Sequence, residues 1–71
     1  MTGTLVTVNG EPRELDAGAT VADLVALLSP APDGRGVAVA VDGEVVPRGA
    51  WEDTELPQGA QVEVLVAVQG G

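Results

Sequence analysis

The sequence contains no cysteine, histidine, lysine, tyrosine or phenylalanine, and its only aromatic residue is Trp51. Without cysteine, the chain has no disulfide, no thiolate zinc site and no thiol nucleophile of its own. The missing residue types also supply most general bases, activated nucleophiles and Schiff-base amines, so nothing stands ready to activate Ser29. A carboxylate cluster at residues 52–55 is typical of a solvated turn, since no group of aromatic residues forms a pocket around it. We therefore expect that the chain is not an enzyme.

Positive charge is also scarce, since three arginines stand against eleven acidic residues and the net charge is −8. Nucleic acids and anionic membranes are bound through basic surfaces, so we expect neither as a partner. No apolar stretch approaches the ~20 residues that span a bilayer, and the N-terminus lacks the basic and apolar segments of an export signal. We expect a soluble, cytoplasmic protein whose acidity serves solubility or steers it onto a basic protein partner.

Aliphatic residues are plentiful, and 45% of the 71 residues are hydrophobic. A chain of this length forms one small domain and buries roughly 60% of its unfolded surface. Its core must be built from valine, leucine and alanine, which suits a small β-sheet. Trp51 lies in a turn-rich stretch, where we expect its ring to be buried and its indole N–H to find a partner.

The first part of the chain has the pattern of a β-hairpin. Residues 4–8 alternate as a strand and run into Asn9-Gly10, the strongest local signal for a two-residue hairpin turn. The return strand is expected to pass through Arg13 to Leu15. Pro12 cannot donate a hydrogen bond to a neighbouring strand, so this return strand is expected at an edge of the sheet.

One helix is predicted over residues 20–29. Thr20 precedes the apolar pattern and Asp23 follows three residues later, a weaker relative of the Ser/Thr-x-x-Glu capping box. Pro30 ends the helix. Spacings of three and four residues place one set of side chains on a face that can cover a sheet, with Leu27 expected to cover its flank: Val21, Leu24, Val25 and Leu28.

A second hairpin repeats the design of the first. Residues 37–41 form a strand, Asp42-Gly43 form a two-residue turn, and residues 44–46 return. Pro47 follows at the end of the return strand, which is therefore also expected at an edge.

The last predicted strand, residues 62–68, is the most continuously apolar segment, as expected for the middle of a sheet. Alternation assigns Val62, Val64, Val66 and Val68 to the core, and places Leu65 and Ala67 on the open face. An exposed apolar residue in a central strand is a candidate docking point, so we expect Leu65 and Ala67 to contact a partner.

These elements predict an α+β fold with a mixed sheet of four to five strands and one helix packed across one face. Because both hairpins have closed outer edges, the last strand takes the central place, and the expected strand order is 2-1-5-3-4. This arrangement resembles the β-grasp fold of ubiquitin and its bacterial sulfur-carrier relatives. It has two hairpins that flank a helix and a final central strand that is followed by Gly70-Gly71.

The resemblance becomes specific in short motifs, and across essentially its whole length the sequence resembles the ThiS family of sulfur carriers of thiamine biosynthesis. The matching pieces are V-N-G-E at 8–11, T-V-A-D-L-V at 20–25, V-V-P-R with Trp51 at 45–51, and the terminal Gly-Gly.

The resemblance implies a β-grasp domain over residues 1–68 and a flexible tail over residues 69–71, whose terminal Gly71 carries the chemistry. In that family an E1-like adenylyltransferase using ATP and Mg adenylates the terminal carboxylate, which corresponds to Gly71 here. Sulfur supplied by a donor such as a cysteine desulfurase or sulfurtransferase then converts it to a thiocarboxylate. Thiazole synthase receives that sulfur to build the thiazole ring of thiamine. The resemblance also implies that the carrier binds no cofactor or metal itself and catalyses nothing.

The tail itself suits this role. An ionised α-carboxylate, with a pKa of roughly 3.5, is a poor electrophile until it gains a leaving group, so activation must come from a partner. Extended, Gln69, Gly70 and Gly71 reach about 10 Å, and the two glycines can pass through a narrow channel into the partner's active site.

Other interpretations remain open. The layout also resembles the small subunit of molybdopterin synthase, a sulfur carrier of another pathway, and a ubiquitin-like modifier joined to target proteins. A purely structural interaction domain is a further alternative, in which Gly70-Gly71 would be only a frayed end. The roles of Arg48 and Trp51 are also undecided, because both are compatible with structure alone.

Overall fold

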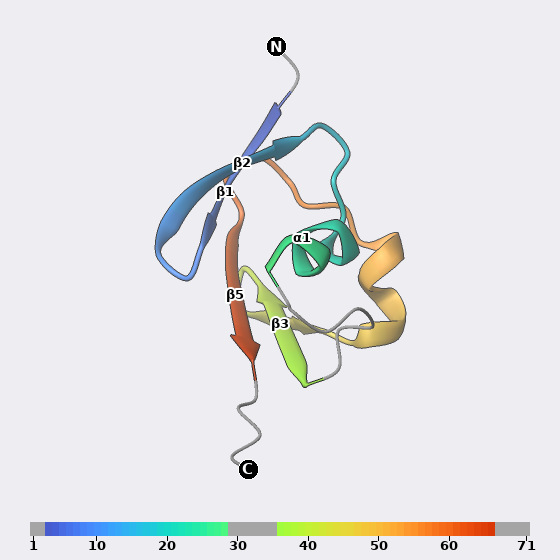
Figure 1. Ribbon diagram of the computed structural model, residues 1–71. Coiled ribbons are helices and arrows are strands. Elements are labelled where there is room, and N and C mark those ends of the chain that lie inside the picture. The colour runs from blue at the N-terminus through green and yellow to red at the C-terminus, as the bar shows by residue number, and fades with distance from the viewer. Residues whose placement is uncertain (1–2, 29–35, 67–71) are drawn as a thin grey trace.

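The computed structural model describes residues 3–28 and 36–66. Five strands, one α-helix and one 3-10 helix follow one another along the chain: β1 (Gly3–Val8), β2 (Glu11–Asp16), α1 (Val21–Leu28), β3 (Val37–Val41), β4 (Glu44–Val46), η1 (Arg48–Asp53) and β5 (Gln61–Val66). The strands form one sheet in the order β2-β1-β5-β3-β4, which confirms the predicted order and the β-grasp arrangement. Helix α1 lies across one face of this sheet (Figure 1).

Strand β5 occupies the centre of the sheet and pairs differently on its two sides. On one side it runs parallel to β1 through only two residue pairs, Thr7–Gln61 and Val8–Val62. On the other side it runs antiparallel to β3 through five pairs, from Val41–Val62 to Val37–Val66. The mixed sheet predicted from the sequence is therefore confirmed, with the parallel contact confined to the start of β5.

Both hairpins have the turns that their sequences predict. Asn9 and Asp42 have φ angles of 50°, and the glycines that follow them have φ angles of 85° and 84°. Two consecutive residues with positive φ define the type I′ turn, whose twist matches that of the flanking strands. Strands β2 and β4 lie at the two edges, as Pro12 and Pro47 predict.

The start of α1 is held by a reciprocal pair of hydrogen bonds. The backbone N–H of Thr20 donates to Asp23 Oδ2 at 3.0 Å, and the N–H of Asp23 donates to Thr20 Oγ1 at 3.2 Å. This is the capping-box geometry, with aspartate in the place of glutamate. Helix α1 begins at Val21, one residue after the predicted start, and Ser29 lies outside the described residues.

The predicted face of α1 is confirmed except at its flank. Val21, Leu24 and Val25 are buried and Leu28 packs against them from the margin of the core. Leu27, expected to cover the flank, is instead 65% exposed. It lies beside β2, the edge strand, where the sheet offers no further strand to pack against.

One prediction for β5, the burial of Val66, is wrong. Val62 and Val64 are buried as expected, but Val66 is 47% exposed and does not belong to the core. Val66 pairs with Val37, the first residue of β3, so it lies at the end of the sheet where core neighbours run out. The described strand also starts one residue earlier than predicted, at Gln61, and Val68 lies outside the described residues.

Trp51 belongs to η1, a short 3-10 helix where the sequence predicted only turns. Its ring is buried in the core, and its Nε1–H donates to the carbonyl oxygen of Val46 at 2.9 Å, which confirms the expected partner. A turn follows at Pro57, since the N–H of Ala60 donates to the Pro57 carbonyl oxygen at 3.1 Å and Gly59 has a φ of 81°.

Candidate functional site

The face of the sheet opposite α1 carries apolar side chains that nothing in the described structure covers. Leu65 of β5 is 69% exposed and pairs directly with Ala38 of β3. Ala40 of β3 pairs with Val45 of β4, which is 74% exposed. Since alternate residues of a strand share a face, these four residues form one surface across β5, β3 and β4, which we call the open-face patch.

The exposure of Leu65 follows the prediction from alternation. Its neighbours Val64 and Val62 supply the core, so Leu65 must point to the other face. The second residue predicted for docking, Ala67, lies outside the described residues. Sequence reasoning missed Val45, because a three-residue edge strand offers too few positions for alternation to be recognised.

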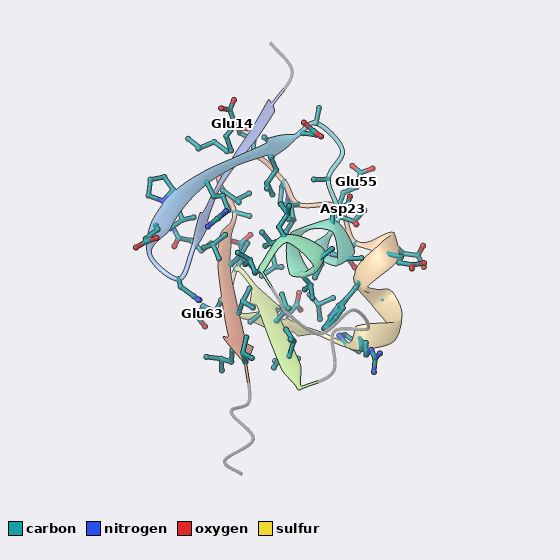
Figure 2. The ribbon with its side chains drawn as sticks, in the orientation of Figure 1. Glu14, Asp23, Glu55 and Glu63 are labelled. Carbon is teal, nitrogen blue, oxygen red and sulfur yellow. The ribbon has the colours of Figure 1, made fainter. Side chains whose placement is uncertain are left out.

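Acidic side chains border this face. Glu63 of β5 pairs with Ala40 and lies next to Leu65 on the open face, and Glu14 of β2 pairs with Leu5 of β1, which is itself about half exposed. Figure 2 shows Glu14 near the start of β1 and Glu63 lower down, beside β5. Arg13 pairs with Val6, a core residue, and so belongs to the helix side of β2. The open face is therefore apolar with an acidic border.

A shallow hollow of about 320 Å³ opens beside Leu65. It lies between the two hairpin turns, over the beginning of β5, and its lining comprises Asn9, Gly10, Gly43, Gln61, Val62, Glu63 and Leu65. The hollow therefore lies beside the open-face patch, on the side of the hairpin turns.

Strand β5 is the last element that the structure describes. Val66 is the last described residue, and Figure 1 shows β5 ending at the opposite end of the molecule from the start of β1. The predicted reactive residue Gly71, with Gln69 and Gly70, lies outside the described residues. Five residues follow Val66, and fully extended they reach at most about 17 Å.

Both hairpin turns contact β5 with a side chain. Asn9 Oδ1 accepts the N–H of Val64 at 2.9 Å, and Asn9 Nδ2 donates to the Val64 carbonyl oxygen at 3.0 Å. Asp42 Oδ1 accepts the N–H of Gln61 at 2.9 Å. The sequence identified both residues as turn formers, but no local signal could reveal partners 55 and 19 residues away.

The remaining acidic residues do not assemble a catalytic or metal site in the described part of the chain. Glu52 and Asp53 are exposed on η1, and Glu55 pairs in an isolated bridge with Thr20 beside the start of α1. Within residues 3–28 and 36–66, no group of three or more acidic side chains is arranged to hold a metal ion. Among the helices described, none has the length and apolarity to cross a membrane.

Comparisons with known proteins agree with one another. The family model of the ThiS family matches residues 6–71. The crystal structure of the thiamine biosynthesis protein ThiS from Geobacter metallireducens is 34% identical, with 96% of this chain and 100% of that chain covered and a TM-score of 0.73.

The solution structure of a thiamine biosynthesis protein from the same organism is also 34% identical, covers 96% of this chain and 88% of that chain, and has a TM-score of 0.75. A search of curated proteins gave no match. The family match spans nearly the entire sequence, and the similar structures share its fold. The chain belongs to the ThiS family.

Proposed function

We propose that this protein is a sulfur carrier of thiamine biosynthesis, and that its C-terminal Gly71 holds the sulfur as a thiocarboxylate. The observation that carries the proposal is the ThiS family match, which continues through the terminal Gly-Gly to residue 71. The similar solved structures, both of thiamine biosynthesis proteins, support the same pathway. In this role the chain is a protein substrate, and its partners supply the catalysis.

Activation of Gly71 requires a partner that uses ATP. A carboxylate oxygen attacks the α-phosphorus of ATP, pyrophosphate leaves, and the resulting acyl adenylate has AMP as its leaving group. The terminal sulfur of a persulfide on the donor then displaces AMP and forms an acyl disulfide. A second thiol of the partner attacks the donor's sulfur, which forms a disulfide on the partner and leaves the thiocarboxylate on Gly71. An E1-like adenylyltransferase with its Mg performs the first step, a cysteine desulfurase or sulfurtransferase supplies the sulfur, and thiazole synthase accepts it, all in the cytoplasm.

In this proposal the chain has two parts: a folded domain over residues 1–68 that binds the partner, and a tail over residues 69–71 that enters its active site. Because Gly70 and Gly71 have no side chains, the tail can enter a narrow channel of the partner while the folded domain stays outside it. Ordering a flexible tail costs roughly 1–2 kcal/mol per residue, so docking of the body must offset that cost.

The open-face patch is the surface that we assign to docking. Leu65 and Val45 expose apolar area near the end from which the tail departs, and burial of such side chains against a partner is favourable by ~1.5–3 kcal/mol each. Ala67, which continues the same alternation, belongs to the proposed contact. The acidic border at Glu63 suits a partner surface that is apolar at its centre and basic around it.

Intact-mass spectrometry tests the proposal directly. The protein is incubated with ATP, an E1-like activating enzyme and a sulfur source, and we expect its mass to rise by the difference between one sulfur atom and one oxygen atom. Deletion of Gly71, or addition of one residue after it, should abolish the change while leaving the fold intact. An unchanged mass on the natural sequence would contradict carrier status.

Two further outcomes would redirect the proposal. Copurification with a molybdopterin synthase large subunit in place of thiazole synthase would assign the carrier to another pathway. Stable isopeptide conjugates in cells, without any thiocarboxylate, would instead indicate a ubiquitin-like modifier.

A further inference from the structure

The parallel contact between β1 and β5 ends early, and a side chain continues it. The backbone N–H groups of Thr7 and Asn9 donate to the carbonyl oxygens of Ala60 and Val62, each at 2.9 Å. After Asn9 the chain turns away into β2, so the backbone of β1 has no further group to offer β5.

The carboxamide of Asn9 takes the place of the next peptide unit. Its Oδ1 accepts the Val64 N–H at 2.9 Å and its Nδ2 donates to the Val64 carbonyl oxygen at 3.0 Å. Both polar backbone groups of Val64 are thereby paired, one residue before Leu65 and two residues before the last described residue. Asparagine suits this position because its amide has both a donor and an acceptor, and because it tolerates the φ of 50° that the turn requires.

Asp42 in the other hairpin has the same backbone conformation but contacts the opposite end of β5. Its Oδ1 accepts the N–H of Gln61 at 2.9 Å, and its own N–H donates to the Gln61 carbonyl oxygen at 2.7 Å. One turn therefore holds the start of β5, and the other holds the part of β5 from which the tail departs.

We propose that Asn9 is a positioning residue for the reactive C-terminus: its paired hydrogen bonds hold β5 at Val64 on the side that faces β1, and so limit fraying of the strand that carries the tail. This inference rests on the proposed function, because it concerns delivery of the Gly71 carboxylate to a partner's active site. We expect Asn9 to affect how the tail is presented to the partner, and not how the folded domain binds it.

The size of the effect follows from the length of the tether. Asn9 holds only one side of β5, because β3 pairs with the other side as far as Val66. If β5 frays from both neighbours back to Val62, nine residues instead of five follow the last paired residue. The effective concentration of a tethered group falls roughly as the −3/2 power of tether length, so this frayed state has an effective concentration about 2- to 3-fold lower, which is the upper limit of the effect.

The test compares Asn9→Gly with Asp42→Gly. Both variants replace a residue at φ 50° with glycine, which adopts that conformation freely, and both delete side-chain hydrogen bonds to β5. Single-turnover adenylation is measured against the concentration of activating enzyme. We expect Asn9→Gly to lower the rate at saturating enzyme by up to about 2- to 3-fold, with the half-saturating concentration unchanged. Asp42→Gly should leave both values unchanged.

Amide hydrogen exchange reports the structural step in the same proteins. Exchange at Val64 should accelerate in Asn9→Gly, and exchange at Gln61 should accelerate in Asp42→Gly. A second variant, Asn9→Asp, keeps the acceptor but places an oxygen against the Val64 carbonyl, so it too should lower the saturating rate.

The outcomes separate the two proposals. Equal saturating rates for Asn9→Gly and the natural sequence, or a change confined to the half-saturating concentration, would overturn the positioning role alone. A loss of rate in Asp42→Gly as large as that in Asn9→Gly would also overturn it, because general weakening of β5 would then explain both. Failure of the natural sequence to form any adenylate would overturn the proposed function and the positioning role together.

Discussion

The two faces of the sheet carry similar aliphatic side chains, but only those on the face beneath α1 are covered by the rest of the domain. Beneath α1, Val6, Val39 and Val62 are almost completely buried, whereas Val45 and Leu65 on the other face are mostly exposed. Burial of apolar area drives folding, so the first set stabilises the domain and the second contributes little to it. The difference separates residues that make the fold from residues available to a partner.

The largest expected effect comes from removing a side chain on the covered face. Leu24→Ala empties a fully buried position and should lower the free energy of unfolding by about 2–5 kcal/mol. Chemical denaturation followed by Trp51 fluorescence measures it. Leu27→Ala on the same helix is the matched control, since Leu27 is mostly exposed, and its effect should stay within about 0.5 kcal/mol.

On the open face the same kind of change should affect binding and spare stability. Leu65→Glu places a charge in the centre of the open-face patch, and we expect affinity for the activating enzyme to fall about tenfold or more, by ~1.4 kcal/mol. Leu27→Glu introduces the same charge at an exposed leucine outside this face and should leave affinity unchanged. Titration calorimetry that found equal affinities for the two variants would remove Leu65 from the docking site.

The helix cap offers a smaller test that touches only the covered face. Thr20→Ala removes the hydroxyl that accepts the Asp23 N–H and should lower the free energy of unfolding by about 1 kcal/mol. Thr20→Ser keeps a hydroxyl and should retain most of the stability. Partner affinity should be the same in both variants. A decrease in affinity specific to Thr20→Ala would show that the two faces are less independent than the structure indicates.

The smallest effect is expected at the acidic border. Glu63→Gln removes one charge beside Leu65, and because exposed ion pairs contribute about 0.2–1 kcal/mol, affinity should fall no more than about fivefold. The loss should disappear at high salt, where surface charges are screened. Glu55→Gln, beside the start of α1, is the control (Figure 2). Stronger binding by Glu63→Gln would argue against a basic partner surface.

Local signals were sufficient to predict most of this fold. Asn9-Gly10 and Asp42-Gly43 set their turns through backbone conformations that few residues adopt, and Pro12 excludes a neighbour on one side of its strand. Since both edges are thereby occupied, the central place of β5 follows.

The wrong predictions concern apolar residues at the ends and edges of the sheet. Val66 and Leu27 continue an apolar pattern correctly, but the pattern contains no information about where β3 begins or where β2 ends the sheet. The pairing of Asn9 with Val64 was missed for a related reason, because a side-chain partner 55 residues away depends on the assembled sheet.

The candidate site divides in the same way. Alternation along β5 predicted that Leu65 would face away from the core, and the structure confirms its exposure. The role of Gly71 came from resemblance to a family and stays a prediction, because the chemistry of a bare carboxylate does not by itself distinguish a working terminus from any other chain end.

Since β1 and β5 run parallel at the centre of the sheet, Gly3 and Val66 lie at opposite ends of the molecule (Figure 1). A fluorophore or surface linker attached at Gly3 is thus separated from Val66 by the length of the sheet. The chain has no cysteine, so one introduced there would be chemically unique. The protein can therefore be anchored at the start of β1 while the end of β5 stays accessible.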